Sequence, residues 1–532
     1  MKINYILSIM SARVRASLSI VIACVMTSLS VMIACLMASC SLDYEPVDTY
    51  SDVTEGVGED NSQAIFRDRA AVLSHRQTLL NLYKNGQEHW YLDMLLLGES
   101  HSDNAYAGSP NAETTPFEVN SIEGSNTNLK RDWNGHMGNI AQANRLINGI
   151  DEVADLTDAE KHQYKAEAQI LRAMIYFDMV RIWGNVPLVT TIASDITAET
   201  VKEVYPAYFP PQTDELTLYQ QIEKDLLEGL AYAPDNNPAD KTMFSKSVAR
   251  ALLAKVYAEK PLRDYDKVVQ YADALAADGF DLVENFSDLF DVVLTDPNQP
   301  PSLNNRAIEA KARNTKETIF EAQFFPGNTN WVTWMYGRPL NDWTFYFTWT
   351  KWITPSRDIT KAFMSETGDK RYAESVVFYA CDWNIYYPAN NYAFMHKCRS
   401  AYNSIIKIRY ADILLLKAEA LIGKNDFTGA ATILNRTRQR AGLSNLPASA
   451  TANKEAILTA YMKERRLELA FEGERWFDLV RLDKVEEVMN AVFAKDEGRP
   501  AQVYPFTQLS YKLPVPQDVI DQNPNLVQNP GY

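Results

Sequence analysis

The segment Ala411-Asp-Ile-Leu-Leu-Leu-Lys-Ala-Glu-Ala-Leu decides the fold class, because its pattern occurs twice in the chain. The other copy is Ala249-Arg-Ala-Leu-Leu-Ala-Lys-Val-Tyr-Ala-Glu, with the same mixture of small and apolar residues. After a short break each copy continues with an Asp-aromatic pair, Asp264-Tyr265 or Asp426-Phe427, and then with a second helical pattern. The repeat predicts two helical hairpins of about 30 residues each, close to a tetratricopeptide period.

The composition of the hairpins indicates how they pack. Small Ala residues let two helices approach closely, and we expect the aromatic residue at the start of each second helix to fill the wedge between them. Stacked hairpins of this kind bury a continuous core and leave a concave face. The two copies are far apart in the sequence, so a regular array is not predicted.

Further helices are predicted from Gln63 onward, over 129–150, and from Asp158 to Trp183. The last has an acidic first turn after Thr157 and ends before Gly184, which are typical helix boundaries. Residues 98–128 are rich in Gly, Ser, Asn and Pro, and a loop of this length is usually functional.

Short β structure is predicted beyond the first hairpin. Residues 317–325 are β-branched and aromatic, which is typical of a strand, and the tyrosine-rich residues 371–397 indicate a β-hairpin. The prolines of residues 513–532 exclude a regular helix or a central strand there.

The N-terminus has the features of a secretory signal. Lys2, Arg13 and Arg15 precede an apolar run that ends in Ala38-Ser39-Cys40. We predict a lipoprotein signal over residues 1–39, lipidation of Cys40 and a tether over residues 40–62. A transmembrane anchor is the alternative, disfavoured because Ser and Thr dilute the run, and Met10 is a second possible start.

Composition narrows the function. The 532 residues carry a formal net charge of −16, so the chain lacks the basic footprint of a nucleic-acid-binding protein. No HExxH, CxxC, Walker A or GxSxG motif occurs, and no cofactor or metal is predicted. Ser100, His101, Ser102 and Asp103 are adjacent, but members of a catalytic triad normally converge from separate segments.

A charged helix is predicted over residues 463–481, which mixes Glu464, Arg465, Arg466 and Arg475 with apolar residues that demand burial. Glu464 and Glu468 lie one turn apart, as a catalytic pair would. Since the arginines are within i,i+3 and i,i+4 reach of the acids, we favour a structural network of ion pairs at a packing seam.

Aromatic residues concentrate between Trp331 and Trp352, a stretch that holds five of the ten tryptophans. Pro, Gly and Asn interrupt it, so it reads as loops with flat apolar faces beside hydrogen-bonding groups, which suits sugar rings. We expect about half of these rings to lie in the core. The predicted stacking residues are Trp331, Trp334, Trp343 and Trp349, followed by Tyr336 and Tyr346.

Several segments together resemble the SusD/RagB family of outer-membrane nutrient-binding lipoproteins. They are the Cys40 lipobox, residues 166–177 with 184–188, residues 409–420, residues 434–442, residues 464–481 and the ending 523–532. They span the mature chain in order. One departure is Lys397-Cys398, where the family often has Lys-Tyr.

The resemblance implies a mainly α fold: tetratricopeptide-like hairpins forming a superhelical scaffold, with a loop-rich ligand-binding part that contains minor β structure. It implies one SusD-like domain over residues 63–532, with an N-terminal part to about 290 and a C-terminal part from about 291. It also places polar ligand contacts at Ser102-Asp103-Asn104, so Asp103 and Asn104 join the predicted site.

The implied function is that of a lipid-anchored protein on the cell surface, without catalysis, which captures an oligosaccharide for a SusC-like TonB-dependent transporter. The alternatives are an oligopeptide or other nutrient as ligand, a glycoside hydrolase, and an adhesion lipoprotein. Cys381 and Cys398 would remain in the mature chain, either bridged or as free thiols.

Overall fold

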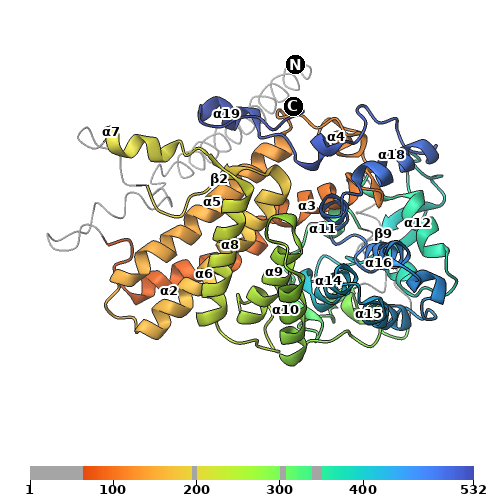
Figure 1. The fold of residues 1–532 in the computed structure, drawn as a ribbon, viewed down its shortest axis with the longest axis horizontal. Coiled ribbons are helices and arrows are strands. Elements are labelled where there is room, and N and C mark those ends of the chain that lie inside the picture. The colour runs from red at the N-terminus through yellow and green to blue at the C-terminus, as the bar shows by residue number, and fades with distance from the viewer. Residues whose placement is uncertain (1–63, 194–200, 300–306, 338–349) are drawn as a thin grey trace, which may run out of the picture. The chain divides into compact units, whose positions relative to one another are not determined.

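The computed structural model describes residues 64–193, 201–299, 307–337 and 350–532. Residues Ile65–Tyr532 form one compact unit, built mainly from helices (Figure 1). Most of its buried apolar side chains form one large core cluster, which reaches from Phe66 to Leu526, and a small second cluster holds Val283, Phe286, Leu289 and Phe290. The predicted N-terminal and C-terminal parts share this core. The predicted signal, the tether and Cys40 lie outside the described residues.

The N-terminal helices begin and end at capping residues. Helix α2 (Arg69–Asn85) begins later than predicted, after Asp68, whose side chain accepts a hydrogen bond from the Ala71 amide at 2.9 Å. Helix α6 (Asp158–Trp183) has the predicted bounds, with a capping box between Thr157 and Glu160 and with Gly184 at a φ of 72°. The other long helices here are α5 (Thr127–Gly149) and α8 (Glu215–Tyr232).

Both predicted hairpins are confirmed. They consist of α9 (Lys246–Ala258) with α10 (Tyr265–Ala277), and of α14 (Tyr410–Gly423) with α15 (Phe427–Arg440). The side chains of Asp264 and Asp426 cap the second helices by accepting backbone N–H bonds. The residue before each predicted wedge aromatic therefore fixes where the second helix begins.

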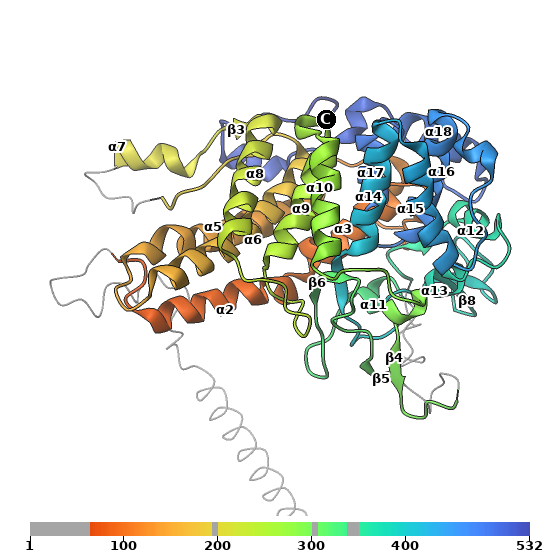
Figure 2. The same cartoon turned by 60° about the horizontal axis from the view of Figure 1, so that its bottom comes forward.

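The two hairpins lie side by side although 130 residues or more separate them in the chain (Figure 2). Helix α10 packs on α14, and a Cβ atom on Gly423 would lie only 2.2 Å from a ring carbon of Tyr265. Gly423 thus lets the predicted wedge residue Tyr265 reach the neighbouring hairpin. The stack runs through α5, α6, α8, α9, α10, α14 and α15, with α16 (Lys454–Glu468) packed on α14 and α15.

Within the described residues, β structure consists of antiparallel pairs of short strands and two isolated bridges. The predicted strand is β6 (Thr318–Ala322), which pairs with β10 (Ile405–Arg409), and the predicted hairpin is β8 (Val376–Tyr379) with β9 (Tyr392–Met395). The other pairs are β1 (Ala105–Tyr106) with β7 (Thr354–Pro355), β2 (Val186–Pro187) with β3 (Gln212–Thr213), and β4 (Val292–Leu294) with β5 (Ala307–Ala310).

Residues 98–128 do not form the one continuous loop that the sequence predicted. They contain the end of η2 (Leu96–Ser100), β1, α4 (Thr115–Val119) and the start of α5, and residues 98–108 are buried. A Cβ atom on Gly98 would lie 2.3 Å from the carbonyl oxygen of Gly473, so this segment packs directly on the turn before α17 (Arg475–Arg481). The polar side chains of residues 98–108 therefore lie inside the unit, whereas residues 110–112 are exposed.

Short elements complete the chain. A six-residue helix, α19 (Gln517–Gln522), follows Pro516 in the segment for which no regular helix was predicted. The remaining helices are η1 (Glu88–Leu92), α3 (Asp93–Leu95), η3 (Ile150–Glu152), α7 (Val201–Val204), η4 (Tyr205–Tyr208), η5 (Lys260–Leu262), η6 (Phe286–Leu289), α11 (Val332–Met335), α12 (Arg357–Met364), α13 (Arg371–Ser375), η8 (Ala448–Thr451), α18 (Val485–Lys495) and η9 (Gln508–Tyr511).

Cys381 and Cys398 are free thiols, so the bridged alternative is not adopted. None of the helices in the described ranges is both long and apolar enough to cross a membrane.

Candidate functional site

Of the three predicted platform residues that the structure describes, Trp331 is the most exposed. Its side chain stands at the start of α11 with 42% of its surface exposed, although tryptophan side chains are highly buried on average. The backbone beneath it is held firmly. Its amide donates to Gln87 Oε1 at 2.8 Å, and the neighbouring Asn330, fully buried, donates to the carbonyl oxygens of Ser400 and Asn403 at 2.9 and 3.1 Å.

The hydrogen-bonded backbone around Trp331 lets its indole offer a flat apolar face, and binding a ligand there would cost little conformational entropy. The buried Thr333 hydroxyl donates to Asn330 Oδ1 at 3.0 Å and extends the same hydrogen-bond network. Because the network fixes the segment before any ligand arrives, stacking on the indole would not require the loop to order first.

Two other predicted platform residues lie deeper. Tyr336 is fully buried, its hydroxyl donates to the carbonyl oxygen of Leu92, and its ring meets Trp352 edge-on at 6.3 Å. Its burial favours a role in the core over the predicted ligand contact. Trp334 is half-buried, and its carbonyl oxygen accepts a hydrogen bond from Lys351 Nζ at 2.7 Å. Trp343, Tyr346 and Trp349 lie outside the described residues, which stop at 337 and resume at 350.

Asp103 and Asn104 lie inside the unit. Asp103 is 1% exposed and Asn104 is fully buried. The Asp103 carboxylate accepts two hydrogen bonds from Arg475, while Asn104 donates to Glu99 at 2.8 Å and accepts from Arg466 at 2.8 Å. Since these partners occupy the polar atoms, the burial of both residues favours a structural role over direct contact with a ligand.

Two neighbouring carboxyls have opposite pKa shifts. Burial raises the pKa of Asp103, but the charges of Arg466 and Arg475 outweigh it and hold the pKa well below its usual value. Burial also acts on Glu99, where hydrogen bonds from Asn104 and the Gly473 amide offset it only in part, and the pKa rises to about 7. The two pKa shifts differ in sign because Asp103 contacts Arg466 and Arg475, whereas Glu99 has mainly uncharged hydrogen-bond donors around it.

Residues 464–481 are the hub of the predicted ion-pair network. Arg465 binds Asp412 and Asp478 at 2.7 Å each. Glu464 accepts from Arg371 at 2.6 Å, and Arg466 contacts Asp103 at 3.1 Å. The predicted buried network is present, but most partners come from distant elements rather than from the same helix. These contacts join the helical stack, the β-containing part and the 98–108 segment.

The adjacent Ser, His and Asp residues do not form a triad. The ring of His101 is fully buried and bonds the carbonyl oxygen of Phe117, and burial lowers the pKa of His101 to about 4. Asp103 is turned toward Arg475, and Ser102 donates to the carbonyl oxygen of Glu99 at 2.8 Å. Among the described residues, no group of three or more His, Cys, Asp or Glu side chains is placed to hold a metal ion.

Sequence reasoning missed a mostly buried aromatic cluster, in which Tyr106 is 0% and Tyr386 is 5% exposed. Tyr106 stacks on Tyr386 at 4.4 Å with nearly parallel rings, and the Arg357 guanidinium lies 4.8 Å from the ring centre of the half-buried Tyr387. Ile385 in the same hairpin loop is 40% exposed. The tyrosine-rich composition of residues 371–397 was a usable signal, which we applied only to the prediction of the hairpin.

The chain is similar to SusD-like proteins along its length. Residues 396–532 match a family model described as "SusD family", and residues 56–258 match one described as "Starch-binding associating with outer membrane". SusD-like protein P38 from Formosa agariphila is 26% identical over 92% of this chain and 95% of its own length.

Solved structures agree on the fold. A SusD superfamily protein from Bacteroides vulgatus has a TM-score of 0.69 at 18% identity and covers 87% of this chain and 99% of its own. A structure described as a laminarin-binding SusD-like protein has a TM-score of 0.65 at 23% identity, covering 88% of this chain and all of its own. At these identities the similarity establishes the fold, which is the helical architecture predicted from the hairpins.

Proposed function

This chain belongs to the SusD/RagB family, and we propose that it is a cell-surface lipoprotein that binds an oligosaccharide and delivers it to a TonB-dependent transporter in the outer membrane. The family description already associates these proteins with starch binding and with the outer membrane. The ligand class, the lipid anchor on Cys40 and the SusC-like partner are the proposed part.

The observation that carries the proposal is the exposed indole of Trp331, whose backbone amide is fixed by a hydrogen bond to Gln87. A sugar ring has an apolar face that stacks on such a surface and hydroxyl groups that bond neighbouring polar atoms. Trp334 and the predicted stacking residues Trp343, Tyr346 and Trp349 would extend the platform. Two or three stacked rings support a Kd in the micromolar-to-millimolar range, roughly −4 to −8 kcal/mol, which suits capture followed by release.

The relatives guide the choice of glycan. One matching family is described as starch-binding, and one structural relative is described as laminarin-binding. Starch and laminarin are both glucose polymers, so glucose oligomers are the first ligands to test.

Catalysis is not part of the proposal. A glycoside hydrolase needs two carboxyls that reach the substrate, one of them with a raised pKa. Glu99 has a raised pKa but is fully buried, and Asp103 is held as a carboxylate between arginines. Neither of these two carboxyls is therefore placed to act on a glycan.

The test is calorimetry of the mature chain with malto-oligosaccharides and laminari-oligosaccharides, with a mixture of oligopeptides as the matched alternative. We expect saturable binding of at least one oligosaccharide series and no release of reducing sugar during prolonged incubation. Binding of peptides alone would favour the second nutrient class, and turnover of the oligosaccharide would favour an enzyme.

A further inference from the structure

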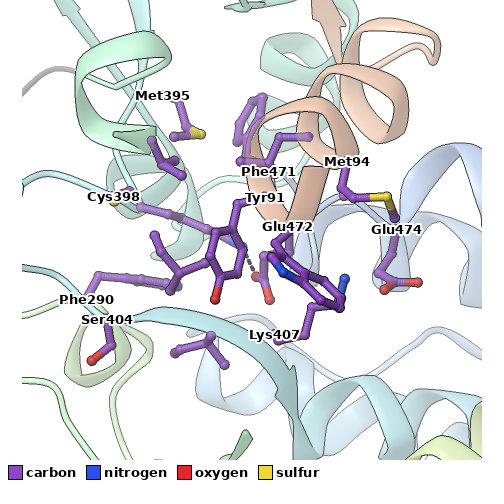
Figure 3. Close-up of a pocket in the computed structure, with 17 residues that line it drawn as sticks. Tyr91, Met94, Phe290, Met395, Cys398, Ser404, Lys407, Phe471, Glu472 and Glu474 are labelled. Carbon is purple, nitrogen blue, oxygen red and sulfur yellow. Dashed lines mark hydrogen bonds and ion pairs between the residues drawn. The ribbon is translucent and has the colours of Figure 1, made fainter. Parts of the chain in front are cut away.

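A cavity of about 80 Å³ lies inside the unit, between η1, α3, β10 and the turn at residues 471–474 (Figure 3). Met395 and Phe471 line one side, and Ser404 and Lys407 lie on the opposite side. The apolar side is sealed, since Met395 is 1% exposed and Phe471 is 3% exposed. The side chain of Lys407 retains 15% exposure, so the polar side is where a ligand could enter.

The size of the cavity sets the size of its occupant. One water needs about 10–15 Å³ of such space, so the cavity has room for several water-sized groups. That space suits one compact ring and not a chain of sugars, so the cavity is a different kind of site from the platform at Trp331.

The charges that line the cavity are already paired. Lys397 binds Glu472, Lys407 donates to Asp178 at 2.8 Å, and Glu474 accepts from Lys255 at 2.7 Å. A charged ligand would have to break one of these pairs or remain uncompensated in a buried place. The lining therefore favours a neutral occupant.

Two hydrogen-bond donors at the cavity lack partners. In the part of the chain that the structure describes, neither the Tyr91 hydroxyl nor the Trp90 indole N–H has a hydrogen-bond partner, and both side chains are at least 97% buried. Buried donors are normally satisfied, so each of these calls for an oxygen acceptor inside the cavity. The rings of Tyr91 and Phe290 also offer aromatic surface beside these donors.

We propose that this cavity binds a single neutral sugar, whose oxygens accept hydrogen bonds from Trp90 and Tyr91 and whose apolar face lies on the aromatic and methyl lining. The choice of a sugar among neutral polar molecules rests on the proposed function of the chain. A free monosaccharide and the terminal residue of a longer glycan share this chemistry, and the size of the cavity favours the free form.

The test uses the mature chain and calorimetry with D-glucose, D-galactose, D-mannose and D-xylose. Tyr91→Phe removes only the unpartnered hydroxyl, so the thermal melt should not move, while binding of the cognate monosaccharide should weaken by about tenfold. Tyr271→Phe on α10, away from the cavity, is the matched control and should bind as the parent does.

A second variant blocks the cavity. Ile406→Phe adds volume at a half-buried lining position and should abolish monosaccharide binding, while Ile192→Phe, at a position 40% exposed, should leave it unchanged. Both cavity variants should still bind oligosaccharides at the platform.

Three outcomes would overturn the inference: none of the four sugars binds, binding is the same in Tyr91→Phe and Ile406→Phe as in the parent, or soaked crystals show only waters beside Tyr91 and Trp90. If the parent chain binds no oligosaccharide, the result counts against the proposed function instead, so the two failures are distinguishable.

Discussion

Arg475 and Asp103 are 372 positions apart in the chain and form a bidentate ion pair in the interior, with Nε–Oδ1 at 2.7 Å and Nη2–Oδ2 at 2.9 Å. Arg466 adds a third contact to the same carboxylate at 3.1 Å. The pair ties the 98–108 segment to the turn and helix at residues 471–481. Asp103, which the family resemblance suggested for ligand binding, thus connects two distant segments of the fold.

Replacement of Asp103 by Asn should destabilise the protein by about 3–5 kcal/mol, because the buried guanidinium of Arg475 loses its carboxylate partner and Arg466 keeps only that of Asp358. The matched control is Asp518→Asn, which removes an exposed pair with Lys130 and should cost at most about 1 kcal/mol. Urea unfolding of the two variants measures the difference. Equal stability of the two variants would show that the buried pair contributes no more than a surface one.

Arg466→Ala should also lower the melting temperature, because Asp103, Asn104 and Asp358 each lose a partner. Oligosaccharide binding by the folded fraction should remain, since none of these contacts involves Trp331. An unchanged melting curve together with lost binding would place this helix in the ligand site.

Glu99 should make stability depend on pH in the weakly acidic range. Its folded pKa of about 7 lies above the ordinary value of 4.5, so the folded state binds more protons than the unfolded state between these values. The contribution of Glu99 to the free energy of unfolding is therefore fully present below about pH 4.5. It falls by about 3 kcal/mol as the pH rises to about 7.

The Glu99→Gln variant isolates this effect. Its free energy of unfolding between pH 4.5 and 7 should lack the decline that Glu99 contributes to the parent. The slopes of the free energy of unfolding against pH are compared, so a pH-independent loss of stability caused by the Gln side chain does not affect the result. Parallel curves for parent and variant would mean that Glu99 titrates normally in the folded protein.

Lipidation of Cys40 is tested by fractionation. Cys40→Ala should yield protein that is soluble or mislocalised and that takes up no fatty-acid probe, because the acyl acceptor is gone. Outer-membrane fractionation together with labelling in this variant would refute the assignment.

The helical scaffold could be predicted from sequence because its signals are local. The period of the hairpins, the caps Asp264 and Asp426, and the boundaries of α6 at Thr157 and Gly184 depend on residues within a few positions of each other. The side-by-side placement of the two hairpins could not be predicted, because it depends on the contact of Tyr265 with Gly423.

The site was less predictable, because it also depends on contacts between segments that are distant in the sequence. Composition alone could not separate the exposed Trp331 from the buried Tyr336, because the surroundings of Tyr336, including the Leu92 carbonyl that its hydroxyl bonds, come from a distant segment. The polar residues 98–108 look like an exposed loop, and only their long-range partners, such as Arg475, show that they are buried.

The most direct test of the account is calorimetry of Trp331→Ala with the oligosaccharide that binds the parent chain best. The indole is 42% exposed, so the variant should fold with an unchanged circular dichroism spectrum. Loss of one stacked ring should weaken binding by roughly 5–30-fold, equivalent to about 1–2 kcal/mol. Tyr504→Ala, at another exposed aromatic position, is the control and should bind as the parent does. A folded Trp331→Ala variant with the affinity of the parent would contradict the platform at Trp331.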